Sequence, residues 1–85
     1  MIRSFATPDT RLLFDGIPID GLPLPVQRRA LMKLQMLHAA GRLEDLRRVV
    51  AFDPARHCVT IDGRAGLCFR WDGSDAHEVE LVGLH

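Results

Sequence analysis

Two cysteines and a neighbouring histidine have the most distinctive chemistry in this sequence. They are His57, Cys58 and Cys68. If the chain turns back symmetrically about Gly63, Cys58 lies directly opposite Cys68 on the neighbouring strand. The pair could then bind a metal ion together with His57, but the sequence has no Cys-x-x-Cys pair of the kind that marks structural zinc sites. Because disulfides are rare in the cytoplasm, we expect two free thiols, with no metal and no cofactor.

The cysteines lie in a C-terminal segment whose apolar residues alternate with polar ones. The alternating apolar residues are Val59, Ile61, Leu67, Phe69, Trp71, Val79 and Leu81. Asp62-Gly63 and the run from Asp72 to Asp75 divide them into three groups. Alternation with a period of two, interrupted by Asp-Gly turns, predicts an antiparallel meander with one buried face and one open face.

The preceding residues read mainly as helix. Residues 1–6 predict a short first strand, and Thr7-Pro8-Asp9 is a typical helix start, for a short helix that ends near Gly16. A proline-rich connection leads to a main helix over residues 25–40, with Gly41 as its C-cap. Residues 42–48 predict one or two further helical turns, and residues 49–52 a short strand. The order predicts an α+β fold with helices on one sheet face.

Length and charge limit the possible functions. At 85 residues we expect one domain over 1–85. No apolar run approaches the roughly 18 residues of a membrane span, and no apolar segment follows the N-terminal charge as in a secretory signal, so we expect a cytoplasmic protein. The net charge of zero divides into +3 for residues 1–48 and −3 for the remainder. The meander therefore lacks the basic surplus typical of a phosphate-binding surface.

Strand parity assigns several arginines to the open face. If Cys58 pairs with Cys68, then Arg56, Arg64 and Arg70 lie on that face. For Arg70 we favour a cross-strand ion pair with Glu78 or Glu80. The basic face of the main helix, with Arg28, Arg29 and Lys33, is either solvated or binds a partner.

Four stretches of the chain together resemble one family. They are MIRSFATPDTRLLF, LEDLR, VTIDGRAGLCFRW and VELVGLH, and they occur in a single register along the whole chain. In this respect the sequence resembles the HigB-like plasmid maintenance killer proteins of the RelE superfamily, the toxins of bacterial type II toxin–antitoxin systems. The resemblance implies an N-terminal strand and two to three helices packed on one face of a C-terminal antiparallel sheet.

The resemblance also implies an activity and partners. Members of the family cut messenger RNA on the ribosome without a metal ion, using basic and imidazole groups around the scissile phosphate, and bind a HigA-like antitoxin that contains a helix-turn-helix. By this resemblance the candidate catalytic residues are His85, His57 and Arg56. The strand-opening arginine of the family falls on Gly66, and the Asp-Tyr before the last histidine falls on Gly83-Leu84.

Three functions follow as alternatives. The first is a toxin with a degenerate active site that still binds its antitoxin. The second is an active endoribonuclease that uses Arg56, His57 and His85. The third is a non-enzymatic module that forms a homodimer through the open sheet face or an edge strand, because that face has an apolar row consisting of Cys58, Thr60, Cys68, Val82 and Leu84.

Overall fold

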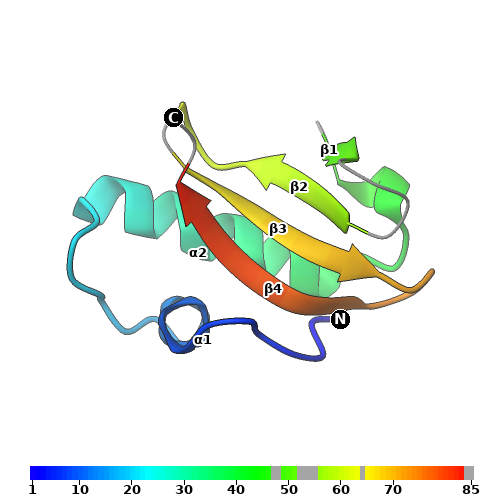
Figure 1. Cartoon of the computed structure of the whole chain (residues 1–85), viewed down its shortest axis with the longest axis horizontal. Helices are drawn as coiled ribbons and strands as arrows, with labels where there is room; N and C mark the ends of the chain where they lie inside the picture. Colours follow the sequence, from blue (N-terminus) through cyan, green and yellow to red (C-terminus); the bar gives the residue numbers. More distant parts are fainter. Residues whose placement is uncertain (47–48, 52–55, 64, 84–85) are drawn as a thin grey trace.

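A four-stranded antiparallel sheet with helices on one side forms the fold (Figure 1). The computed structural model describes residues 1–46, 49–51, 56–63 and 65–83. Within these ranges the elements follow in the order α1 (Pro8–Phe14), α2 (Leu24–Ala39), the 3₁₀ turn η1 (Leu43–Asp45), β1 (Val49–Ala51), β2 (Arg56–Thr60), β3 (Ala65–Trp71) and β4 (Ala76–Gly83). The strands are arranged in the order β1-β2-β3-β4. The predicted α+β class, with a C-terminal meander, is confirmed.

Helix α1 begins at the predicted residue, Pro8, and ends at Phe14, close to the predicted end near Gly16. The Thr7 hydroxyl accepts a hydrogen bond from the Thr10 N–H, and Pro8 occupies the first helical position. At the other end Gly16 adopts φ +80°, and the Gly16 and Ile17 N–H groups donate to the carbonyls of Leu13 and Leu12. This is a Schellman motif, which sets the direction in which the chain leaves the helix.

Helix α2 is the main cover of the sheet. Its buried side consists of Gln27, Ala30, Leu34 and Leu37, at the three-four spacing expected of an amphipathic helix. The prediction that Gly41 forms the C-cap is wrong. The helix ends at Ala39 with extended Ala40 as its cap, because the Gly41 N–H donates to the Asp45 carboxylate of the following turn instead. None of the helices in the described ranges is long and apolar enough to cross a bilayer.

The β2–β3 hairpin has the predicted register, with Cys58 opposite Cys68. The expectation of free thiols is wrong for this structure, because the two cysteines form a disulfide. Both cysteines are almost completely buried, although they lie on the face of the sheet away from the helices. Direct opposition across neighbouring strands brings the two sulfurs within bonding reach.

Strand β4 contains a bulge at Glu78. Cys68 pairs with Glu80 but Arg70 pairs with His77, so Glu78 and Val79 together oppose one residue of β3. Glu78 adopts φ +53°, a left-handed conformation that is unusual for a residue with a side chain. The extra residue reverses the parity of the strand.

The N-terminal segment lies along the free edge of β4 (Figure 1). The predicted first strand is present only as two parallel bridges, from Ile2 to Ala76 and from Phe5 to Val79. These bridges are separate because the Glu78 bulge interrupts the ladder between them. Further along the same edge, the Leu81 N–H donates to the buried Thr10 hydroxyl at 3.0 Å. The edge is thereby closed to pairing with another strand.

The core lies between the sheet and the two helices. The predicted inward residues of β2, β3 and β4 face it, and Phe69, Leu67, Val79, Leu34 and Leu37 are its largest fully buried apolar side chains. Trp71 and Leu81 are partly buried against the same cluster. With this face covered, the opposite face of the sheet is available for function.

The disulfide generates the first prediction. It closes a loop between residues separated by 10 positions, and the restriction of the unfolded chain should contribute about 2–3 kcal/mol. The double variant Cys58→Ala/Cys68→Ala, and the wild type in dithiothreitol, should both unfold at lower urea concentration. The double variant should not respond to dithiothreitol. Equal urea midpoints for the wild type with and without reductant would contradict the disulfide.

Candidate functional site on the open sheet face

Three rows of side chains cross the open face of the sheet. Each row is a set of cross-strand neighbours, and such neighbours share a face. The rows, each ordered from β2 through β3 to β4, are Arg56–Arg70–His77, Cys58–Cys68–Glu80 and Thr60–Gly66–Val82. The first, which we call the cation row, brings two guanidinium groups and an imidazole together.

Every member of the cation row faces a carboxylate. The Arg56 guanidinium donates to Glu80 at 2.9 Å, and the Arg70 Nε lies 3.9 Å from a Glu78 oxygen. The sequence prediction of an Arg70 pair with Glu78 or Glu80 is confirmed for Glu78. The side chains of Arg56 and Arg70 are 43% and 47% exposed, so both guanidinium groups lie within reach of a ligand from solvent. Partly exposed ion pairs of this kind are weak and can exchange partners.

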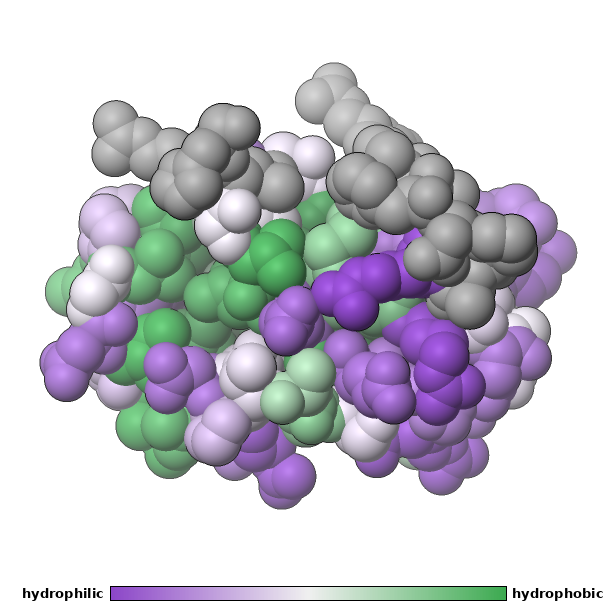
Figure 2. Space-filling model, viewed as in Figure 1, coloured by the Kyte–Doolittle hydropathy of each residue, from purple (hydrophilic) through white to green (hydrophobic). Residues whose placement is uncertain are grey.

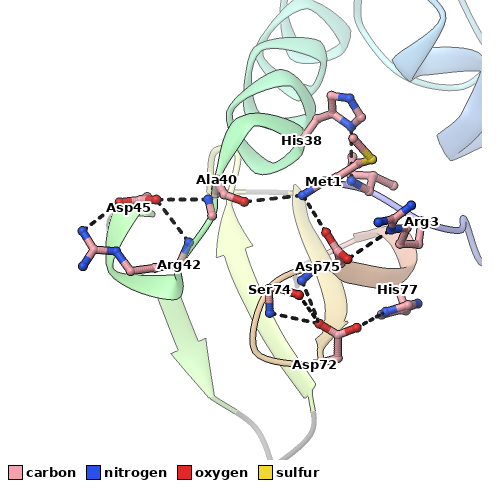
Figure 3. Close-up of polar contacts among 12 residues, drawn as sticks. Met1, Arg3, His38, Ala40, Arg42, Asp45, Asp72, Ser74, Asp75 and His77 are labelled. Carbon is pink, nitrogen blue, oxygen red and sulfur yellow. Dashed lines mark hydrogen bonds and ion pairs between the residues drawn. The ribbon is translucent and has the colours of Figure 1, made fainter.

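Asp72 holds the imidazole of His77 in place (Figure 3). Its Oδ2 lies 2.7 Å from His77 Nε2, while its Oδ1 accepts hydrogen bonds from the N–H groups of Ser74 and Asp75. These bonds, the one from His77 above all, hold the pKa of Asp72 well below its ordinary value. Asp72 therefore stays ionised and orients His77.

A second carboxylate in the same turn joins it to the N-terminal segment (Figure 3). Asp75 accepts a hydrogen bond from the Arg3 guanidinium at 3.1 Å and lies 3.2 Å from the Met1 ammonium group. The hydrogen bond from Arg3 is the main cause that lowers the pKa of Asp75. The turn that supplies Asp72 is thus fixed from two sides.

The chemistry available to the cation row is proton transfer next to an anion. When His77 Nε2 carries the hydrogen and donates it to Asp72, Nδ1 is left as the proton acceptor. Arg70 directly neighbours His77, and Arg56 neighbours Arg70. A phosphate that displaced one of the glutamates would therefore lie between a guanidinium and a base, as general base catalysis with charge stabilisation requires.

The residues predicted from the resemblance do not form one cluster. Arg56 lies on the open face, but His57 lies on the opposite face of β2, where its ring packs 6.1 Å from that of Phe69. The Nδ1 atom of His57 is buried and has no hydrogen-bond partner within the described residues. His85, Arg64 and Leu84 lie outside the described residues.

Sequence reasoning missed His77. Simple alternation assigns it to the same face as Val79, toward the core. The Glu78 bulge reverses this assignment, so that Ala76 and Val79 are both buried while His77 pairs with Arg70 on the open face. The one available signal was its spacing from Asp72, five residues back across the turn.

The surface seen from the open side divides into two parts (Figure 2). Hydrophilic atoms gather at the end that holds the Asp72–Asp75 turn, and hydrophobic atoms gather at the end where α2 begins. The cation row belongs to the hydrophilic end, whereas Val82 and Gly66 lie two rows away. Within the described ranges, no group of three or more histidine, cysteine or acidic side chains is arranged to hold a metal ion.

The Asp72–His77 contact predicts an acid-sensitive stability. A carboxylate whose pKa is lowered by folding stabilises the protein above its ordinary value of 3.8 and loses this contribution as the pH falls below it. In urea unfolding at pH 6 and pH 3, Asp72→Asn should be less stable than the wild type at pH 6 and should lose less stability on acidification. Asp20→Asn is the control, because the exposed Asp20 makes no ion pair or hydrogen bond within the described residues. An equal acid loss in Asp72→Asn and the wild type would refute the prediction.

Comparison of the sequence with models of known protein families gives no match, and a search of curated proteins gives no significant relative.

Proposed function

We propose that this chain is a HigB-like toxin of a bacterial type II toxin–antitoxin system, which acts in the cytoplasm and pairs with a HigA-like antitoxin. In this proposal the open sheet face binds messenger RNA on the ribosome, and the protein cleaves that RNA with low activity. The observation that carries the proposal is the cation row on the face that the helices leave uncovered. The chain-wide resemblance supports it independently of the structure.

In the proposed reaction, His77 takes the place that the resemblance gives to a strand histidine. Its Nδ1 accepts the proton of a ribose 2′-hydroxyl, and the 2′-oxygen attacks the adjacent phosphorus. Arg70 and Arg56 neutralise the charge that develops on the phosphate oxygens. The 5′-oxygen leaves as an alcohol after it takes a proton from water, and the other product is a 2′,3′-cyclic phosphate.

The charge balance of the face supports weak rather than strong activity. Three carboxylates, Asp72, Glu78 and Glu80, oppose two guanidinium groups and one imidazole. A phosphate must displace a carboxylate before it contacts a guanidinium, and that exchange reduces the net gain from binding. Gly66, at the position of the family's strand-opening arginine, adds no compensating cation.

The second candidate is a non-enzymatic module of the same fold that binds the antitoxin or a second copy of the chain. The neutralised cation row favours it, because a face without surplus positive charge attracts a polyanion poorly. Growth and RNA measurements separate the two candidates.

The first test of the toxin proposal is inducible expression in bacterial cells, with growth and transcript 5′ ends as readouts. We expect slowed growth and new 5′ ends, both relieved when the gene next to that of the chain is expressed. His77→Ala should lower cleavage about 100-fold, since loss of a general base typically costs this much. His57→Ala should leave cleavage within about threefold if the protein folds, because His57 faces the core.

Each other result has a definite meaning. Cleavage lost in His57→Ala or in a variant of His85, with circular dichroism unchanged, and retained in His77→Ala would return the catalytic role to the residues of the resemblance. Normal growth and intact transcripts with abundant folded wild-type protein would refute cleavage and leave the non-enzymatic candidate.

The neutralised face predicts a gain of RNA binding when a carboxylate is removed. Glu80→Gln removes the negative charge that lies 2.9 Å from the Arg56 guanidinium, so the affinity for a single-stranded oligoribonucleotide at low salt should rise. In fluorescence anisotropy, the slope of log affinity against log salt should steepen by about 0.7, the value for one added phosphate contact. Glu44→Gln, on the 3₁₀ turn, removes the same charge away from the open face and is the matched control. Equal gains in both variants would show a general charge effect and contradict a specific role for Glu80.

A further inference from the structure

A concave apolar surface lies on the helical side of the molecule. The groove has a volume of about 260 Å³ and runs between the end of α1 and the first half of α2. Apolar side chains of Leu13, Ile17, Leu24 and Leu31 line it, and Arg28 stands beside them. Ile17 and Leu24 are 48% and 56% exposed, which is high for large apolar side chains at the wall of a groove.

The groove is held open by a buried glutamine. Gln27 is only 7% exposed, and its side-chain amide donates to the carbonyls of Ile19 and Leu22 while its carbonyl accepts from the Ile19 N–H. These three bonds fix the connection before α2 on the helix, and the Schellman motif at Gly16 fixes its other end. A partner therefore finds the groove preformed and does not have to order it.

The apolar surface continues from the groove along the outward side of α2. Met32 and Met36 are 62% and 43% exposed. They follow Arg28 and Leu24 at intervals of four residues, which places all four on one stripe of the helix. Single exposed apolar residues are common, but most of the strongly exposed ones in the described ranges gather here. Flexible methionine side chains suit a surface that accepts another apolar face.

Positive charge flanks this stripe, and helix α2 itself has no acidic residue to compensate it. Helix α2 has Arg28, Arg29 and Lys33 and no acidic residue over its 16 residues. Arg29 lies 4.0 Å from an Asp62 oxygen, while Arg28 and Lys33 make no ion pair within the described part of the chain. An occupant with carboxylates on the flanks of an apolar ridge complements both properties.

We infer that the groove and the Leu24–Met36 stripe of α2 form a docking surface for an acidic amphipathic helix of a partner protein. A helix that inserts its apolar ridge between two helices is a common recognition mode. A polyanion would leave the groove empty, and a membrane surface would not enter it. The inference rests on the proposed function for the existence of a protein partner, but it does not require that the open face cleave RNA.

Methionine methyl groups report on this surface directly. The chain has three methionines: Met32 and Met36 lie on the stripe, whereas the Met1 ammonium group lies just past the end of α2, between Asp75 and the Ala40 carbonyl. In protein with ¹³C-labelled methionine methyls, we would titrate a synthetic helical peptide of about five turns, with leucines at i, i+3, i+4 and i+7 and glutamates beside them. The Met32 and Met36 signals should shift and saturate, and both should shift more than the Met1 signal. A peptide with lysines instead of glutamates should bind at least tenfold more weakly.

A matched pair of charge reversals tests the charge requirement. Arg28→Glu should lower the affinity for the acidic peptide about tenfold or more at low salt. Arg42→Glu makes the same charge change on a side chain that is 77% exposed, next to the 3₁₀ turn, and should change this affinity little. No methyl shift with the acidic peptide at millimolar concentration would overturn the inference. Equal affinity for the two peptides would also overturn it. Met32 shifts that depend on protein concentration alone would overturn it as well and would assign the surface to a second copy of the chain. Because the titration needs no nuclease activity, its outcome is separate from that of the growth assay.

Discussion

The bulge at Glu78 and Val79 is the constraint on which both faces of the sheet depend. Strand β4 must bury Ala76, Val79 and Leu81 and also present His77 and Glu80, and simple alternation cannot do so. One extra residue in the strand makes both arrangements possible. It requires a left-handed backbone conformation at Glu78, which destabilises the folded state by about 1–2 kcal/mol. The Ser4 hydroxyl accepts a hydrogen bond from the Glu78 N–H at 2.8 Å, and the Ser4 carbonyl accepts one from the Val79 N–H, so the bulge is supported from outside the sheet.

This support explains why the N-terminal segment lies where it does. Its backbone bonds to β4 at Ala76, before the bulge, and at Val79, within it, and the Thr10 hydroxyl accepts a hydrogen bond from the next N–H group on this edge, that of Leu81. An open strand edge would otherwise leave these donors and acceptors free to pair with another chain. With this edge closed by the N-terminal segment and one face covered by helices, the open face and the outward side of α2 are two surfaces that remain accessible to partners.

The sequence predicts the elements well and the parity of β4 poorly. Alternation and three-four spacing define the meander and α2 because both patterns record burial, and the Asp62-Gly63 turn is enough to place Cys58 opposite Cys68. Whether the two thiols are joined depends on redox chemistry, which residue spacing does not record. The bulge has no glycine to mark it, so His77 appears buried from its position alone. Gln27 is missed for a related reason: a glutamine on a buried helical stripe is explained only by the loop carbonyls that it binds.

The fold places the unevenly distributed charges of the sequence on two different sides of the molecule. Arg56 and Arg70 of the meander are paired with glutamates on the open face, whereas Arg28 and Lys33 lie on the helical side with no ion pair in the described residues. Because α2 packs on the sheet face opposite the cation row, a helix bound along its outward side would leave Arg70 and His77 uncovered (Figure 1). A partner at that surface would therefore not inhibit RNA cleavage by blocking the cation row itself. It would have to reach around the sheet with a second segment or prevent the chain from entering the ribosome.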